Sequence, residues 1–134
     1  MSSLEDFGEI TRVDEPLAPY TWMKIGGPAK FFIEPRNPDE LVALIRCCHA
    51  ADIPMRLLGG GSNLLIRDRG VGGVVIKRDG DEFSKIEIDG TTVTAGAAAL
   101  LSLVISQTVK AGLAGFETLA GIPGTIGGAL HGNA

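Results

Sequence analysis

The segment RLLGGGSNLLIRD (56–68) contains the residues of this chain that are best suited to bind an anion. Three consecutive glycines at 59–61 are followed by Ser62 and Asn63. Glycine lets a main chain approach a ligand without an intervening side chain, and successive amides in a tight turn form an anion-binding nest. The segment therefore predicts an anion site, and the alternative interpretation is an ordinary surface turn.

Two common phosphate-binding loops do not match this segment. A P-loop requires Gly-x-x-x-x-Gly-Lys-Ser/Thr, and no lysine follows these glycines. The dinucleotide fingerprint Gly-x-Gly-x-x-Gly places its third glycine five residues after the first, and counting from Gly59 that position is Leu64. An anion at this loop would therefore be held by a different arrangement of donors.

A second glycine-rich segment, LAGIPGTIGGALHGNA, occupies residues 119–134. Pro123 fixes one backbone angle, and the glycines are spaced so that amides alternate with the apolar side chains of Ile122 and Ile126. One interpretation is an extended wall that contacts a flat aromatic ligand. Tight packing between helices is the equally supported alternative.

The elements around the first loop are predicted from local signals. Residues 30–34 and 55–58 are expected strands, and between them Asn37 is an expected N-cap with Pro38 in the first helical position. Apolar spacing predicts a buried helix face made of Leu41, Leu44, Ile45 and Cys48. A strand–helix–strand unit of this length predicts parallel strands, whose carboxyl ends commonly bind ligands.

The rest of the sequence predicts a different order of strands and helices. A third buried strand at 73–77 precedes an expected hairpin at 86–95 and a helix at about 98–111 that ends at Gly112. The first twenty residues are expected to be a weakly structured lead-in. The predicted fold class is therefore α+β, with a small parallel βαβ subdomain followed by a second α+β subdomain, and a boundary near 78–83.

Composition excludes several function classes. The net charge is -4 and no long basic run occurs, so nucleic acid is not an expected partner. The longest apolar run has eleven residues, whereas a membrane span needs about 20. The adjacent Cys47 and Cys48 fit neither a disulfide framework nor a zinc pattern, so no metal site is expected. With no secretory start, a cytoplasmic location is expected, and no obligate protein partner is inferred.

Several separated motifs, in order and spacing, resemble the bacterial UDP-N-acetylenolpyruvoylglucosamine reductases, which belong to the flavoenzymes with a vanillyl-alcohol-oxidase-type (PCMH-type) FAD-binding domain. The resemblance covers residues 21–134 and is carried by TWMKIGGPAKFFIEP, LLGGGSNLLIRD, VTAGAA, GLAGFETLAGIPGTIGGAL and NA. It implies a first FAD-binding subdomain at 21–80 and a second at 81–134. The second subdomain would be truncated at Ala134, and the substrate-binding domain would be absent.

The resemblance also implies which residues bind FAD, without a covalent bond. The first loop would wrap the FAD pyrophosphate, residues 96–97 would lie beside the flavin chain, and the second glycine-rich segment would form a wall along the cofactor. The implied cofactor-binding residues are Leu58, Gly59, Gly60, Gly61, Ser62, Asn63, Leu64, Gly96, Ala97, Gly121, Ile122, Pro123, Gly124, Thr125, Gly127 and Gly128.

The activity implied by the resemblance is the NADPH-dependent reduction of UDP-N-acetylenolpyruvoylglucosamine to UDP-N-acetylmuramate in peptidoglycan biosynthesis. The catalytic residues of that family lie beyond Ala134, so no catalytic residue is assigned and this chain alone is expected to have no turnover. Two alternatives stay open. The chain could be the FAD-binding domain of another flavin oxidase or dehydrogenase of this type, or a non-catalytic flavin-binding stub.

Overall fold

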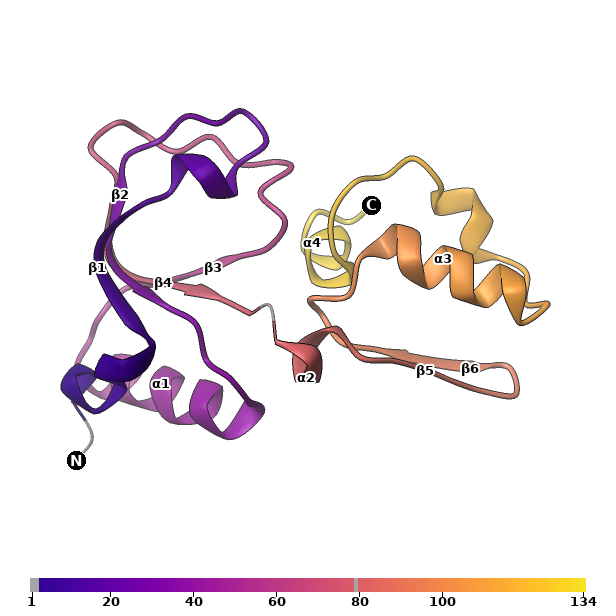
Figure 1. Cartoon of the computed structure of the whole chain (residues 1–134), viewed down its shortest axis with the longest axis horizontal. Helices are drawn as coiled ribbons and strands as arrows, with labels where there is room; N and C mark the ends of the chain where they lie inside the picture. The colour runs from indigo at the N-terminus through magenta and orange to yellow at the C-terminus, as the bar shows by residue number, and fades with distance from the viewer. Residues whose placement is uncertain (1–2, 79) are drawn as a thin grey trace. The chain divides into compact units, whose positions relative to one another are not determined.

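The computed structural model describes residues 3–78 and 80–134, and the chain divides into two compact units, Met1–Gly80 and Asp81–Ala134. Figure 1 shows their helices and strands. The first unit contains, in order, the 3-10 helix η1 (Leu4–Ile10), β1 (Thr11–Pro16), the 3-10 helix η2 (Ala18–Tyr20), β2 (Pro28–Ile33), α1 (Pro38–Ala50), β3 (Met55–Leu58) and β4 (Val71–Lys77).

The four strands of the first unit form one mixed sheet in the order β1-β2-β4-β3. β2 and β3 both pair in parallel with β4, which confirms the parallel unit. The expected lead-in is wrong, because β1 pairs antiparallel with β2 and residues on both sides of β1 are buried. Phe7 is 8% exposed and Leu17 is 1% exposed. The segment 3–20 is therefore structured and contributes Phe7 and Leu17 to the core.

Helix α1 begins where its sequence signals predict. The Asn37 side chain accepts a hydrogen bond of 2.9 Å from the amide of Glu40, and Pro38 occupies the first turn. Its buried face differs from the predicted one. Leu44 and Cys48 are fully buried, but Ile45 is 38% exposed and Cys47 takes its place in the core. The prediction for Ile45 is wrong because the side of α1 that contacts the sheet is rotated by part of a turn from the predicted side.

Both faces of this sheet are covered, and alternate residues of each strand enter opposite cores. One core places Ile33, Val74 and Ile76 against α1 and η1. The other places Phe32 and Val75 with Leu17, Ala29 and Leu58, and Tyr20 and Ile66 pack against it. The loops after β3 and before β2 lie on this second side, away from α1, as Figure 1 shows. The candidate anion loop therefore begins at the end of a buried strand.

The second unit contains α2 (Asp81–Ser84), a hairpin of β5 (Ile86–Asp89) and β6 (Thr92–Ala95), α3 (Leu101–Lys110), the 3-10 helix η3 (Phe116–Leu119) and α4 (Ile126–His131). The hairpin is confirmed, and Gly90 has a positive φ of 61° in its turn. Leu101, Val104 and Thr108 form the buried side of α3, whereas Leu100 and Ala111 are exposed. In the described part of the chain, no helix has the length and apolar character needed to cross a membrane.

Candidate functional site

The loop from Leu58 to Leu64 follows the carboxyl end of the parallel strand β3. Leu58 is anchored in the core at 4% exposure, and the chain then reaches the surface at Gly60 and Asn63. Among the described residues, the amides of residues 60–63 donate to no main-chain carbonyl. Four successive uncommitted donors at this position are what an anion-binding loop needs.

One glycine of this loop has a purely structural explanation. Gly61 is buried with a φ of 71°, and a side chain there would overlap the carbonyl of Tyr20. The carbonyl of Gly61 in turn accepts a hydrogen bond of 3.0 Å from the amide of Trp22. Gly60 is different, because it is exposed and has no positive φ. The fold therefore requires a glycine at position 61. At position 60, close approach of a ligand is the explanation to test.

The loop is held in place by a second glycine-containing loop, residues 20–28. The Gly27 amide donates a hydrogen bond of 2.9 Å to the Arg67 carbonyl, and Gly70 packs so closely on Pro28 that a side chain would overlap its carbonyl. Main chain thus lies against main chain along both loops. The candidate anion-binding segment is therefore held in place by main-chain contacts with residues 20–28.

Beneath the loop, charged and aromatic side chains form a network on the sheet. The rings of Tyr20 and Phe32 stack with centroids 4.8 Å apart, and Arg12 lies over the Phe32 ring at 5.2 Å. Arg12 also contacts Glu15 and Glu34 in ion pairs. Burial, together with the hydrogen bond that Tyr20 donates to Glu15, raises the pKa of Tyr20. The tyrosine therefore stays a neutral donor that ties η2 to β1.

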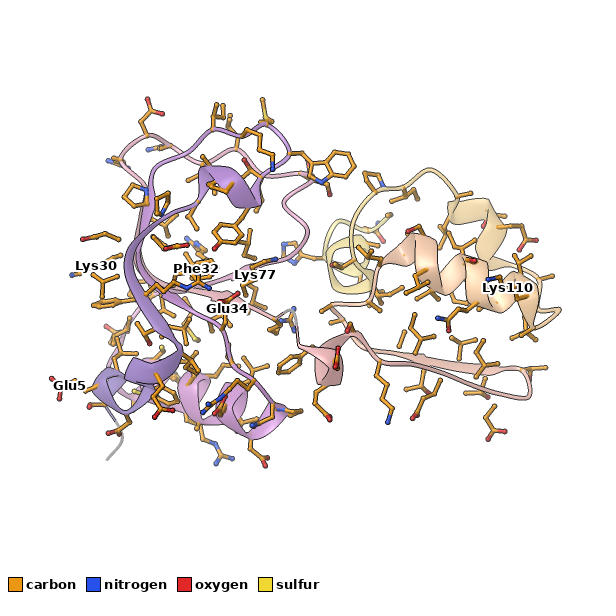
Figure 2. All side chains as sticks on the ribbon, in the orientation of Figure 1. Glu5, Lys30, Phe32, Glu34, Lys77 and Lys110 are labelled. Atoms are coloured by element: carbon orange, nitrogen blue, oxygen red, sulfur yellow. The ribbon has the colours of Figure 1, made fainter. Side chains whose placement is uncertain are left out.

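Lys77 reaches this loop from the end of β4. Its Nζ lies 3.4 Å from the Gly59 carbonyl oxygen and 5.9 Å from the centroid of the Tyr20 ring. Lys77 is labelled in Figure 2. Sequence reasoning missed this residue, because its signal was only a lysine at the end of the apolar strand VVIK.

In the second unit, the predicted residues Gly96 and Ala97 are engaged within the fold. The Gly96 amide donates a hydrogen bond of 2.8 Å to the Lys85 carbonyl, and a side chain at Gly96 would overlap the carbonyl of Phe83. The carbonyl of Ala97 accepts from the Gly127 amide at 2.8 Å. The structure therefore brings Ala97 and Gly127 together.

The second glycine-rich segment consists of a loop followed by a closely packed helix. Residues 126–131 are helical and pack closely, since a side chain at Gly127 would lie 3.0 Å from the Ala97 carbonyl oxygen. The Thr125 side chain caps this helix by accepting from the Gly128 amide at 3.2 Å. Residues 120–125 precede the helix as a loop in which Gly121 and Gly124 have φ values of 89° and 105°. Only this loop could act as an extended wall.

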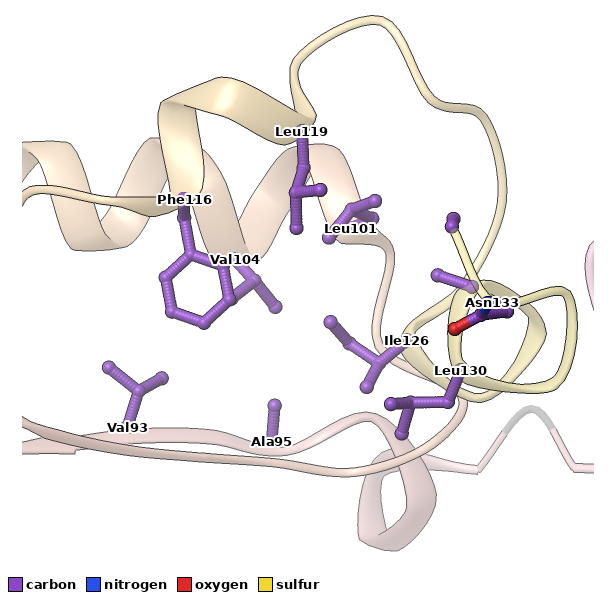
Figure 3. A pocket seen from close by; sticks show the side chains of 11 residues that line it. Val93, Ala95, Leu101, Val104, Phe116, Leu119, Ile126, Leu130 and Asn133 are labelled. Atoms are coloured by element: carbon purple, nitrogen blue, oxygen red, sulfur yellow. The ribbon is translucent and has the colours of Figure 1, made fainter.

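An apolar pocket of about 340 Å³ lies between the hairpin, α3, η3 and α4 of the second unit. Figure 3 shows apolar side chains around it, and Asn133 is its one labelled polar side chain. Its lining contains none of the residues predicted to bind the cofactor. A small-molecule site normally has several converging polar groups, so this pocket is a poor candidate for the anion chemistry.

The described residues offer little acid–base chemistry. Within 3–78 and 80–134, no group of three or more His, Cys, Asp or Glu side chains could hold a metal ion. His49 and His131 are both exposed. Cys47 and Cys48 are both buried, with no disulfide between them.

Comparison with known proteins identifies the ligand class that such a fold holds. Residues 29–134 match the family model described as "FAD binding domain". The chain belongs to this FAD-binding domain family. The α+β fold of the PCMH type predicted from the sequence is thereby confirmed.

The resemblance to UDP-N-acetylenolpyruvoylglucosamine reductases is also confirmed. This FAD-binding domain chain is 50% identical over 128 residues to the reductase of Phenylobacterium zucineum, with 95% of the chain and 42% of the relative covered. It is 50% identical over 126 residues to the reductase of Parvibaculum lavamentivorans, covering 94% and 40%. The chain thus spans about 40% of the length of these relatives.

Solved structures agree with this family assignment. The reductase from Thermus caldophilus is 38% identical, with a TM-score of 0.68, and the match covers 89% of this chain and 40% of that one. A cholesterol oxidase from Brevibacterium sterolicum is 19% identical, with a TM-score of 0.55 over 68% of this chain and 19% of its own. The second likeness concerns the fold alone.

Proposed function

We propose that this chain binds FAD non-covalently, as the cofactor-binding portion of an NADPH-dependent reductase. The enzyme would convert UDP-N-acetylenolpyruvoylglucosamine to UDP-N-acetylmuramate for peptidoglycan, in the cytoplasm. The observation that carries the proposal is the loop at 58–64, whose four uncommitted amides follow a parallel strand in a chain of the FAD-binding domain family. Such amides suit the two negative charges of a diphosphate.

The residues of the chain would act by binding and orientation. The amides of Gly60, Gly61, Ser62 and Asn63 would hold the diphosphate. Main-chain contacts of Gly61 with Tyr20 and Trp22 already support this loop, which reduces the ordering cost of binding. The predicted wall at Gly121, Ile122, Pro123, Gly124 and Thr125 would supply apolar contact to the cofactor. Bound FAD supplies hydride transfer, which no side chain of this chain can perform.

Flavin retention by the purified chain tests the proposal. The absorbance spectrum after incubation with FAD and gel filtration should show bound flavin. Gly60→Val should abolish retention, because it places a branched side chain on an exposed stretch where the diphosphate would approach. Gly72→Val is the matched control, since a side chain at that exposed position in β4 meets nothing within 4 Å. A folded wild-type chain without flavin would contradict the proposal.

Reductase turnover by this chain alone is not expected. The predicted cofactor site contains no acid that could deliver a proton to a substrate carbon. Substrate-dependent oxidation of NADPH by the purified, FAD-loaded chain would contradict this part of the proposal. A second enzyme class, another flavin oxidase or dehydrogenase, has only the cholesterol oxidase likeness in its favour, and that likeness is restricted to the fold.

A further inference from the structure

Lys77 is the one lysine found beside the proposed diphosphate loop among the contacts of the described residues. It is the last residue of β4, next to the end of β3 where the loop begins, because Leu58 and Lys77 are partners in the parallel ladder. Its Nζ is 3.4 Å from the Gly59 carbonyl oxygen, and the Tyr20 ring lies 5.9 Å from the same nitrogen. The side chain is half-buried, so its position is set by packing as well as by charge.

This contact has a geometric consequence for the next amide. In a trans peptide the carbonyl and the following N–H point in opposite directions, and the described chain contains no cis peptide. With the Gly59 carbonyl directed at Lys77, the Gly60 N–H is directed away from it. The Trp22 amide fixes the Gly61 carbonyl in the same way, at 3.0 Å, and thereby orients the Ser62 N–H. Two of the four loop amides are therefore oriented from outside the loop.

We propose that Lys77 is a positioning residue for the anion site, orienting the Gly59–Gly60 peptide and adding a positive charge beside it. The inference rests on the proposed function, because it names a residue that prepares that same loop for a diphosphate. The sequence has no lysine directly after the three glycines, in contrast to a P-loop. The structure adds a cation that contacts the loop from its protein side and needs no direct bond to the ligand.

The test measures FAD affinity by quenching of flavin fluorescence in the full chain. Lys77→Met keeps the apolar stem and removes the charge and the donor. FAD binding should weaken about tenfold, a loss of about 1.4 kcal/mol in binding free energy, because the Gly59–Gly60 peptide loses its orienting contact and the nearby positive charge. Lys77→Arg should restore most of the affinity. The slope of log Kd against log salt should become shallower in Lys77→Met.

Lys30→Met is the matched control. Lys30 lies on β2 with its Nζ 5.5 Å from the Phe31 ring, it is exposed, and its loss changes the net charge equally. It should leave the affinity unchanged. Urea unfolding should show similar stability for both methionine variants. Should Lys77→Met not fold, Lys77→Gln replaces it and is expected to weaken binding several-fold.

Three results would overturn the inference. If Lys77→Met, or Lys77→Gln in its place, bound FAD with wild-type affinity, Lys77 would not prepare the loop. The proposal that the chain binds FAD would still stand. Equal losses in the Lys77 and Lys30 variants would assign the effect to net charge. A loss that follows reduced stability and is not restored by Lys77→Arg would assign it to folding. No flavin binding by the folded wild type would instead remove the proposed function, and this inference with it.

Discussion

The amide of Trp22 donates a hydrogen bond of 3.0 Å to the carbonyl of Gly61, joining the loop before β2 to the loop after β3. The Tyr20 carbonyl occupies the space beside Gly61 where a side chain would extend. Two loops that are far apart in the sequence thus support each other through main-chain contacts. The shape of the candidate anion site depends on this pair of contacts.

Gly61→Ala should destabilise the chain by about 2–4 kcal/mol, because it combines a left-handed backbone with overlap on the Tyr20 carbonyl. Urea unfolding followed by circular dichroism measures the change. Gly72→Ala is the control, since its side chain would meet nothing within 4 Å, and it should change the free energy of unfolding by less than about 0.5 kcal/mol. Equal effects of the two substitutions would contradict the close approach at Gly61.

Leu17→Ala should cost about 2–4 kcal/mol of stability, because Leu17 is 1% exposed in the core beneath the loops. Val13→Ala, on the neighbouring strand β1, removes a side chain that is 64% exposed and should cost far less. Chemical unfolding of both variants provides the comparison. A Leu17 variant as stable as the wild type would mean that the first twenty residues do not contribute to the core.

Glu40 should make stability depend on pH in the acid range. Hydrogen bonds from the Arg36 side chain and amide, at 2.6 and 2.7 Å, lower the pKa of Glu40. Because the folded-state pKa is below the unfolded one, this stabilisation is present above the unfolded value of about 4.3 and is lost as pH falls through the folded pKa. The change is small because Arg36 is exposed.

Urea midpoints measured between pH 6 and pH 2.5 provide the check. Glu40→Gln, which cannot titrate, should lower stability at neutral pH and flatten this part of the profile. Parallel profiles for wild type and variant would count against the Arg36–Glu40 pair.

Native Cys47 and Cys48 should react slowly with thiol reagents. They are 4% and 0% exposed, and burial, with a smaller effect of the neighbouring Cys47, raises the pKa of Cys48. Reaction requires an accessible thiolate, so both groups should become reactive only on unfolding. Time courses with an aromatic disulfide reagent, with and without urea, measure this. Rapid labelling of the native chain would show that the core does not cover the thiols of α1.

Local signals in the sequence were sufficient to predict several elements of secondary structure. The Asn37 cap, the adjacent proline and the apolar spacing predicted α1, and the alternation around Gly90 predicted the hairpin. The glycines of the loop after Leu58, together with the other motifs, led to the family. The helix and the hairpin could be predicted because each depends on residues near one another in the chain.

Other features were decided by contacts between distant segments. β1 is a polar edge strand with Pro16 at its end, so its pairing with β2 has no strong local pattern. The register of α1 on the sheet decided that Ile45 is exposed and Cys47 is buried. The sequence by itself determined α1, the hairpin, the position of the glycine loop and the family resemblance. Only the tertiary structure decided that Gly61 faces Tyr20 and that Lys77 contacts Gly59, because both contacts join segments that meet only when the sheet assembles.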